Sequence, residues 1–407
     1  MKKVVISIIF FLCIIAGGYA YFIQESNISE VFSTMTSVEK YAISQSEYPP
    51  MDNTRYLKPD YSSFYKRNVY NFWNGLCNKI SIALGLKETP LWTPNSFKDL
   101  LENLTKDRID EGYDGEHVLK FVPQVGSKIV LWGDLQGAFH SFTRDLKKLI
   151  ELGFIDNNLK IIQPNCYFIF NGDLISRSPY IMETLTLAMR IMKKNPKQVF
   201  YIKGNHETHD YWQGYGLKTE LKLRAKKLSD EKVPLAREIN SFFNTLPLAL
   251  FLGINPNSDT DFVQISHILS DQTEKLNIQN FSGFLSKKEK DNLNILAFKF
   301  DSLIPSEKPV ELKAIITGQD REFAYEQNKG LLLLPSIHGA IVWTALSCPT
   351  LAYQGEFGFR NDAFVTISVD NNPYEWLITL NNQDAKELDG FIKTSYKMLT
   401  GEKIDDR

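Results

Sequence analysis

Three short apolar runs, each ending at a glycine followed by a polar residue, lie between positions 128 and 205. They read KIVLWGD, CYFIFNGD and VFYIKGN and begin at Lys128, Cys166 and Val199. Runs this short, rich in β-branched and aromatic residues, are typical of buried strands. Two stretches with apolar residues at helical spacing, 139–154 and 180–194, separate them. The alternation predicts a βαβ arrangement in which three parallel strands bring their carboxyl ends to one edge.

The pattern continues on both sides of this unit. FVQISH, KAIITG, AIVWTALS and AFVTISVD predict four further strands, and DAKELDGFIKTSYKML predicts a closing amphipathic helix. Upstream, Thr93 and Pro94 open a stretch with apolar residues at helical spacing, which predicts a capped helix. We therefore expect a polar, aromatic-rich and mostly helical extension over 24–122, a main α/β domain over 123–380 and a C-terminal helix over 381–407.

The first 23 residues differ from the rest. Lys2 and Lys3 precede an uncharged apolar run at positions 4–23. Twenty helical residues span about 30 Å, enough for a single membrane anchor. A cleaved signal peptide fits too, because Gly18, Tyr19 and Ala20 offer the small residues of a cleavage site. We expect an exported protein, either anchored in a membrane through 4–23 or secreted or periplasmic.

Composition narrows the classes of partner. The 407 residues carry a net charge of -2 and are 43% hydrophobic, so the chain is globular and lacks the basic field that favours nucleic-acid binding. The four cysteines have no metal-ligand spacing, which excludes a zinc finger.

Each of the first three strands ends in side chains able to bind a cation. Asp134 ends the first, Asp173 the second, and Asn205 with His206 the third. Carboxylates that converge at a strand edge repel one another unless divalent cations lie between them. The pattern therefore predicts a dinuclear metal site.

These segments, GDLQG, GDLISRS and GNHE, resemble the three signatures of the phosphoprotein-phosphatase (calcineurin-like) family of metallophosphoesterases. That family's signatures read Gly-Asp-x-His-Gly, Gly-Asp-x-x-Asp-Arg-Gly and Gly-Asn-His-Glu. FFNTLPLAL, ISHILS and LSCPTLAYQGEF are similar to later segments of the family, in the same order, so the resemblance covers roughly residues 128–370. It implies an α/β fold, a sandwich of two mixed β-sheets flanked by helices.

The resemblance also implies a role for each residue. Arg177 would bind phosphoryl oxygens, His206 would be the general acid, and Tyr353 would line the pocket. The implied metal ligands, for two divalent ions that activate a water, are Asp134, Gln136, Asp173, Asn205, His267 and Gln319.

The chain departs from the family signatures at three positions. Gln136 and Gln319 stand where the family has metal-binding histidines, and Ser176 replaces the aspartate that orients the general acid. Because an amide oxygen is a weaker and harder ligand than imidazole, we expect Mn²⁺, with Mg²⁺, iron or Zn²⁺ as alternatives. His338 is an alternative ligand, and Lys299 and Arg321 are candidates for the family's second phosphate-binding arginine.

We therefore expect a metal-dependent phosphomonoesterase, similar to serine/threonine protein phosphatases and weakened by these substitutions. Its substrate would be a phosphorylated protein or a small phosphoester such as a dinucleoside polyphosphate. The alternative from another class is a degenerate phosphoesterase fold that binds a phosphorylated partner without turnover.

Overall fold

The structure of the protein is a computed structural model. It describes residues 32–45, 92–176, 180–208, 211–228, 231–253, 262–267, 295–299, 312–318, 331–337, 340–345, 363–381 and 386–388. The helices are α2 (Met35–Ser44), α5 (Pro94–Asp110), α6 (Phe139–Glu151), α7 (Ile181–Lys194), α8 (Tyr211–Gly214), α9 (Leu217–Arg224) and α10 (Ala236–Phe243), with 3-10 turns η2 (Asn205–Glu207) and η6 (Pro373–Glu375).

The strands form two mixed sheets. The six-stranded sheet has the order β13-β12-β11-β2-β3-β4 and the seven-stranded sheet the order β7-β1-β5-β6-β8-β10-β9. The first contains β2 (Lys128–Trp132), β3 (Cys166–Asn171), β4 (Val199–Ile202), β11 (Phe364–Ser368), β12 (Leu377–Asn381) and β13 (Lys386–Leu388). The second contains β1 (His117–Phe121), β5 (Leu250–Gly253), β6 (Phe262–Ile265), β7 (Ile295–Lys299), β8 (Leu312–Thr317), β9 (Leu331–Ile337) and β10 (Ala340–Ala345).

The parallel βαβ unit is confirmed. β2 pairs in parallel with β3, and β3 in parallel with β4, so their carboxyl ends lie at one edge. The connections α6 and α7 coincide with the two stretches of helical spacing. Two mixed sheets flanked by helices are the architecture that the sequence predicts.

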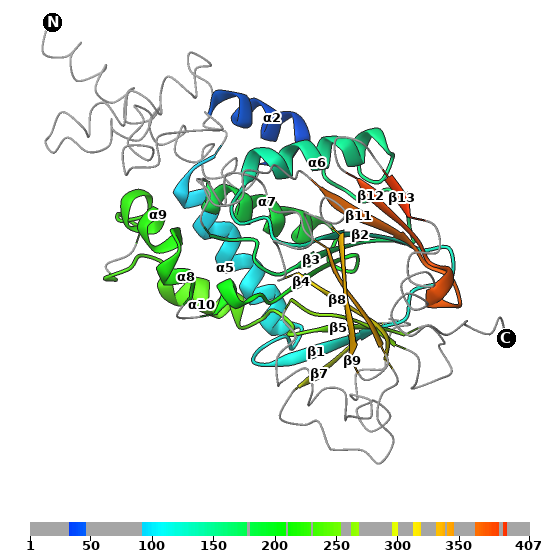
Figure 1. Ribbon diagram of the computed structural model, residues 1–407. Coiled ribbons are helices and arrows are strands. Elements are labelled where there is room, and N and C mark those ends of the chain that lie inside the picture. Colours follow the sequence, from blue (N-terminus) through cyan, green and yellow to red (C-terminus); the bar gives the residue numbers. More distant parts are fainter. Residues whose placement is uncertain are drawn as a thin grey trace, which may run out of the picture.

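Alternating side chains of the central strands build two separate cores. Val130 and Trp132 on β2 join the apolar cluster beneath the helices. Ile129 and Leu131 on the same strand join the cluster shared with the seven-stranded sheet. Because successive side chains of a strand point to opposite faces, one strand serves both cores. The result is three layers: helices, the six-stranded sheet and the seven-stranded sheet (Figure 1).

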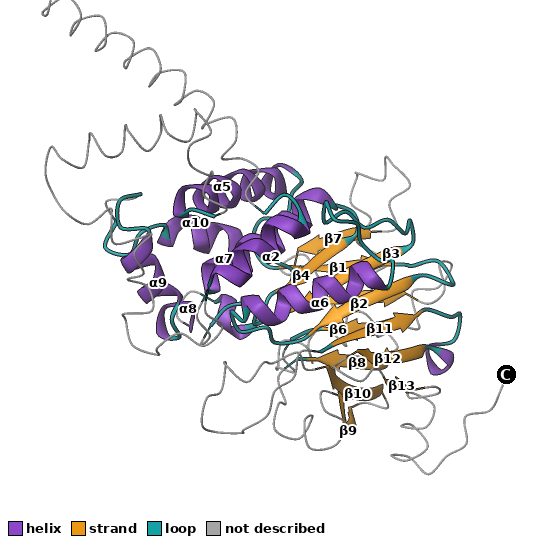
Figure 2. Ribbon diagram, turned by 90° about the horizontal axis from the view of Figure 1, so that it is seen from above, coloured by secondary structure: helices purple, strands orange, loops and turns teal. Residues whose placement is uncertain are grey.

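α6 crosses the outer face of the six-stranded sheet in the view from above, and α7 packs beside it (Figure 2). α2 packs on α6, α5 packs on α7, and α10 packs on α5. α5 begins where the sequence predicts: the Thr93 hydroxyl accepts from the Ser96 N–H at 3.1 Å, with Pro94 at the first position. The neighbouring Trp92 Nε1 donates to the hydroxyl of Thr186 on α7 at 2.9 Å. The segment that begins α5 is thus held against α7 by a specific hydrogen bond.

Two segments differ from the sequence-based expectations. β1 lies inside the range 24–122 that we expected to be mostly helical, and it pairs in parallel with β5. Lys386–Leu388 fall inside the expected C-terminal helix, and that expectation is wrong for these residues, because they pair with β12 as strand β13. Pairing with a neighbour distant in the sequence overrides local periodicity in both places. The rest of the expected helix lies outside the described residues.

Among the described residues, no helix combines the length and the apolar character needed to cross a membrane. The apolar run at 4–23 lies outside them.

Buried charges join α2, α7 and α9. Arg224 pairs with Glu183 and Glu220, and the Tyr41 hydroxyl donates to Glu183 at 2.6 Å. The Glu220 carboxylate also accepts from the Met182 N–H at 3.2 Å. Burial and the neighbouring Glu183 raise the pKa of Glu220 to about 7, although Arg224 opposes this.

The raised pKa predicts a pH-dependent stability. Because Glu220 holds its proton more tightly in the folded chain, its contribution is fully present below about pH 4.5 and is lost as the pH rises through about 7. In the wild type, this group should lower the free energy of unfolding by an amount on the order of 2 kcal/mol between pH 4.5 and about pH 7. We expect Glu220→Gln to remove this decrease. Urea unfolding across this range measures it. The exposed Glu151→Gln is the control, and an unchanged profile in Glu220→Gln would contradict the assignment.

Candidate metal centre

Sharp turns after the parallel strands bring the chemistry to one edge. Asp134 lies two residues after β2 and Asp173 two residues after β3. Gln136, Asp173 and Ser176 all have a positive φ, of 51°, 49° and 124°. Side chains other than glycine rarely adopt such angles, and they concentrate at functional sites. The backbone here is strained in a way that turns polar side chains inward.

Two glycines allow the loops to close around His267. A Cβ on Gly172 would lie 2.7 Å from both Gly204 Cα and the His267 ring. A Cβ on Gly318 would lie 2.7 Å from His267 Nδ1. Because these distances are far below ordinary contact, only glycine fits at either position.

Asp134, Asp173 and His267 form a fully buried cluster. One ligand atom from each lies within 4.8 Å of those of the other two. His267 Nε2 is 3.3 Å from Asp173 Oδ2, and Nδ1 is 3.8 Å from Asp134 Oδ1. Two buried carboxylates at this spacing require positive charge between or beside them. The sequence predicted that these three residues meet.

The donor set around His267 fits a cation. His267 Nδ1 lies 2.8 Å from the Asn171 carbonyl, while Nε2 faces Asn205 Oδ1 at 3.1 Å as well as Asp173. Both ring nitrogens thus face acceptors, which only a protonated ring, or a metal ion in place of the Nε2 proton, can satisfy. Burial opposes the charged ring, yet Asp173 and Asp134 raise the pKa of His267 to about 10. Burial likewise opposes the charge of Asp173, but His267 and His206 lower its pKa to about 2.

Gln136 lies between the two carboxylates. Its Nε2 donates to Asp134 Oδ2 and to Asp173 Oδ2, each at 3.1 Å. Its Oε1 accepts from the Ser176 hydroxyl at 2.9 Å. The sequence predicts an amide oxygen directed at a metal, whereas in this structure the amide nitrogen faces the carboxylates, so the role of Gln136 as a ligand stays a prediction.

His206 lies at the margin of the cluster. Its backbone N–H donates to Asp173 Oδ1 at 3.0 Å, and its Nε2 is 3.6 Å from Asp173 Oδ2. The ring contacts Tyr215 edge-on, with centroids 4.6 Å apart, and Tyr215 stacks on Tyr211 at 6.2 Å. Both tyrosines are exposed, so His206 lies between the buried carboxylates and an aromatic surface. This is a suitable position for a proton donor to a bound substrate.

Glu207 supports the loops, a role that the sequence analysis missed. Its carboxylate accepts from the backbone N–H groups of Asp173, Leu174 and Gly204 at 2.9, 3.0 and 2.8 Å. The Tyr201 hydroxyl donates to it at 2.8 Å. In the sequence, only its position as the last residue of GNHE marks Glu207, because the groups that it binds come together only in the folded chain.

Other predicted site residues lie outside the described part of the chain. They are the implied phosphate-binding Arg177, the pocket tyrosine Tyr353, the implied ligand Gln319 and the alternative ligand His338, together with Arg321. Lys299 is the last residue of β7. Their roles stay predictions.

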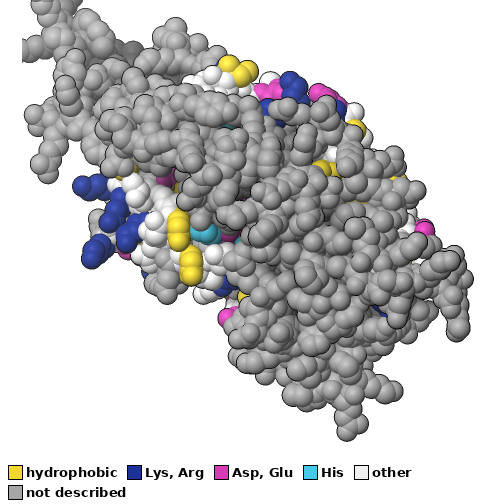
Figure 3. All heavy atoms as spheres, viewed as in Figure 1, with side chains coloured by type: hydrophobic (Ala, Val, Ile, Leu, Met, Phe, Trp, Pro, Cys, Tyr) yellow, Lys and Arg dark blue, Asp and Glu magenta, His cyan; other side chains and the backbone are white. Residues whose placement is uncertain are grey.

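A basic surface lies on α9 and the residues after it. It consists of Lys218, Lys222, Lys226 and Lys227, of which the last three are exposed. Figure 3 shows Lys and Arg side chains gathered over the part of this face where Figure 1 places α8 and α9. α8, the helix before α9, carries Tyr211, whose ring centroid lies 6.0 Å from that of His206. Such a surface attracts anions.

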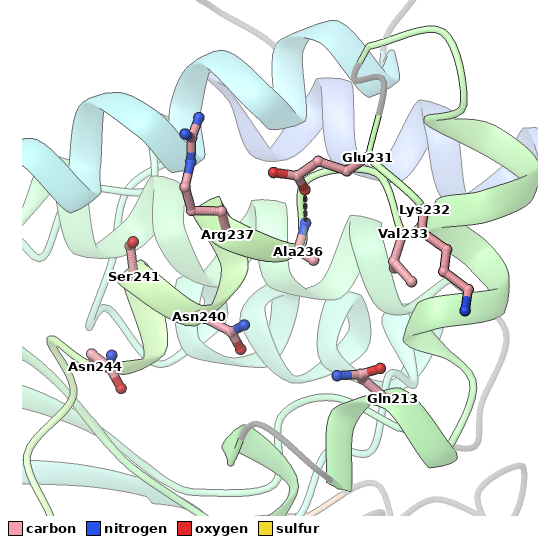
Figure 4. Close-up of a pocket in the computed structure, with 9 residues that line it drawn as sticks. All are labelled: Gln213, Glu231, Lys232, Val233, Ala236, Arg237, Asn240, Ser241 and Asn244. Atoms are coloured by element: carbon pink, nitrogen blue, oxygen red, sulfur yellow. Dashed lines mark hydrogen bonds between the residues drawn. The ribbon is translucent and has the colours of Figure 1, made fainter.

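A separate cavity of about 510 Å³ lies beside α10. Figure 4 shows its lining, including the Glu231 carboxylate, which accepts from the Ala236 N–H at 3.2 Å. None of the predicted site residues lines it. The cavity therefore belongs to a different part of the surface from the carboxylate cluster.

Comparison with known proteins gives a family match over the central part of the chain. Residues 127–327 match the family model described as calcineurin-like phosphoesterase. A serine/threonine protein phosphatase from Saccharomyces cerevisiae, described as similar to human PP5, is 17% identical, with a TM-score of 0.44 over 79% of this chain and 98% of that chain. A cold-active protein-tyrosine phosphatase from a psychrophilic Shewanella species is 13% identical, with a TM-score of 0.40 over 66% and 82%. Neither structure is similar enough to indicate a substrate.

Proposed function

Residues 127–327 of this chain form a calcineurin-like phosphoesterase domain, and from this premise we propose that the protein is a metal-dependent phosphomonoesterase. One observation supports this most directly. The buried cluster of Asp134, Asp173 and His267 has the charge and donor types of a divalent-cation site, and His206 lies at its margin. No other group of histidine, cysteine or acidic side chains in the described residues has this arrangement.

When bound, divalent cations would supply a water of lowered pKa and would polarise the phosphoryl group. Asp134, Asp173, Asn205 and His267 would hold them, and Mn²⁺ remains the expected ion. The chain itself contributes two further elements. The Asp173 carboxylate positions the His206 backbone, and the His206 ring would give a proton to the departing oxygen of the substrate.

We infer phosphorylated protein, at serine or threonine, as the substrate class, with a small phosphoester as the other candidate. The basic surface on α9 supports an anionic substrate. The stacked pair of Tyr211 and Tyr215 offers an apolar contact for the group that carries the phosphate. Phosphate release from phosphothreonine and phosphoserine peptides, compared with p-nitrophenyl phosphate and a dinucleoside polyphosphate, tests this choice.

Turnover itself is tested with metal-free protein refilled with Mn²⁺. We expect phosphate release to return with Mn²⁺ and to be absent in its absence. If no release occurs with Mn²⁺, Mg²⁺, Fe²⁺ or Zn²⁺, the hydrolase proposal is wrong.

His206→Asn is expected to reduce turnover of a phosphothreonine peptide by about 10²-fold, because a proton donor contributes this much when the leaving group is poor. The loss should be far smaller on p-nitrophenyl phosphate, because nitrophenolate leaves without protonation. Steady-state kinetics on both substrates give the ratio. His140→Asn is the matched control, since its ring contacts the Ala42 carbonyl instead of the cluster. Equal losses on both substrates would contradict a role as general acid.

One observation favours a second function. Gln136 directs amide N–H groups at both carboxylates, where a metal ligand would present a lone pair. A domain that binds a phosphorylated partner without turnover is consistent with this. Binding of the phosphothreonine peptide without phosphate release would support that function over hydrolysis.

Export, through a membrane anchor or a cleaved signal peptide at 4–23, remains our proposal from the sequence. Fractionation together with the N-terminal sequence of the mature protein separates the two routes. A soluble protein beginning near Tyr21 would contradict the anchor.

A further inference from the structure

Two departures from the family signatures contact each other. Gln136 stands in the first signature and Ser176 in the second, 40 residues apart, and the Ser176 hydroxyl donates to Gln136 Oε1 at 2.9 Å. Both side chains are almost fully buried. The two residues therefore form one hydrogen-bonded unit, here called the Gln136–Ser176 pair.

The two carboxylates set the direction of the amide, because the Ser176 hydroxyl could either donate to an amide oxygen or accept from an amide N–H. With Oε1 engaged by Ser176, the two N–H groups of Nε2 point at Asp134 Oδ2 and Asp173 Oδ2, each at 3.1 Å. The reverse orientation would direct an amide oxygen at two carboxylates, which repel it in the absence of a cation. The amide thus provides two donors at the position where a cation would otherwise join these carboxylates.

Asp173 Oδ2, which accepts from Gln136, also faces His267. His267 Nε2 lies 3.3 Å from Asp173 Oδ2 and 3.1 Å from Asn205 Oδ1, so these three residues meet at this ring nitrogen. This position offers a carboxylate, an amide oxygen and an imidazole, a donor set suited to Mn²⁺.

We propose that the Gln136–Ser176 pair replaces the first of the two expected cations, and that the chain binds one divalent cation tightly, through Asp173, Asn205 and His267. Binding of a second cation beside Asp134 requires the amide to rotate and to give up both carboxylate hydrogen bonds. That cation is therefore held far more weakly. The inference rests on the proposed function, because it concerns the metal centre of that site.

The first test is metal stoichiometry, measured by isothermal titration with Mn²⁺ and by elemental analysis of the desalted protein. The wild-type chain should hold one Mn²⁺, and Gln136→His, which restores an imidazole, should hold two. The exposed Gln124→His is the matched control and should hold one. Two ions bound with similar affinity in the wild type would overturn the inference and leave the hydrolase proposal intact. No binding in the wild type would overturn both.

The second test needs no metal. In excess EDTA, Gln136→Met removes both N–H donors at similar side-chain volume and leaves Asp134 and Asp173 without their bridge. The melting temperature should fall by about 3 °C or more relative to the wild type. An unchanged melting temperature in EDTA would show that the amide does not bridge the carboxylates and would overturn the inference.

Discussion

Replacing Asp173 by asparagine is expected to reduce phosphate release by about 10³-fold or more. Asp173 is fully buried and contacts His267, Gln136 and the backbone of His206, so three parts of the centre meet at this carboxylate. A charge-stabilising contribution of several kcal/mol corresponds to a loss of this size, since each 1.4 kcal/mol is about tenfold in rate. Turnover of p-nitrophenyl phosphate with Mn²⁺ measures the loss.

Asp145 provides a matched control. It is also a buried aspartate, on α6, and its carboxylate accepts from Trp132 Nε1 at 3.1 Å. Asp145→Asn makes the same change of carboxylate to amide at a residue outside the metal centre, so kcat and the amount of bound Mn²⁺ should be retained. Near-normal turnover in Asp173→Asn, or an equal loss in both variants, would contradict a metal-binding role for Asp173.

Glu207→Ala is expected to lower the free energy of unfolding by about 4 kcal/mol or more. The carboxylate accepts three backbone N–H groups and the Tyr201 hydroxyl, all buried, and each donor left without a partner costs about 1–3 kcal/mol. Burial and the charge of Asp173 raise the pKa of Glu207 to about 7, so part of this stabilisation is offset by the cost of burying the carboxylate. Urea unfolding at pH 7.5 in EDTA measures the change.

Two further variants test whether the loss of stability is specific to Glu207 or follows the removal of any carboxylate. Glu207→Gln retains one acceptor oxygen and should fall between the wild type and Glu207→Ala. The exposed Glu231 accepts the Ala236 backbone N–H, and Glu231→Ala should cost less than about 1 kcal/mol. A small effect in Glu207→Ala would show that the loops close around the centre without this carboxylate.

The parallel unit could be predicted from sequence because each element carries its own signal. β2, β3 and β4 are short apolar runs bounded by glycine, and α6 and α7 have apolar residues at helical spacing. Local signals failed where pairing decided the outcome. β1 lies in a polar segment and is recruited by β5, and β13 lies in a segment of helical periodicity and is recruited by β12.

The candidate site divides in the same way. Asp134, Asp173, Asn205, His206 and His267 could be predicted because each follows a recognisable strand or lies in a family signature. The roles of Gln136, Ser176 and Glu207 could not, since each depends on partners from a different loop. A Gln136 amide read from sequence is a weak ligand, whereas in the folded chain it is a donor to two carboxylates.

The sequence by itself determined which polar residues follow the strands and in which order the signatures occur. The first follows because the carboxyl ends of parallel strands lie at one edge, and the second indicates the family of the domain. The direction of the Gln136 amide and the approach of the carboxylates that raise the pKa of His267 against its burial arise only when β2, β3, β4 and β6 place their ends together. Hydrogen-bond direction and charge–charge contacts depend on distances between residues far apart in the chain, and only the tertiary structure sets those distances.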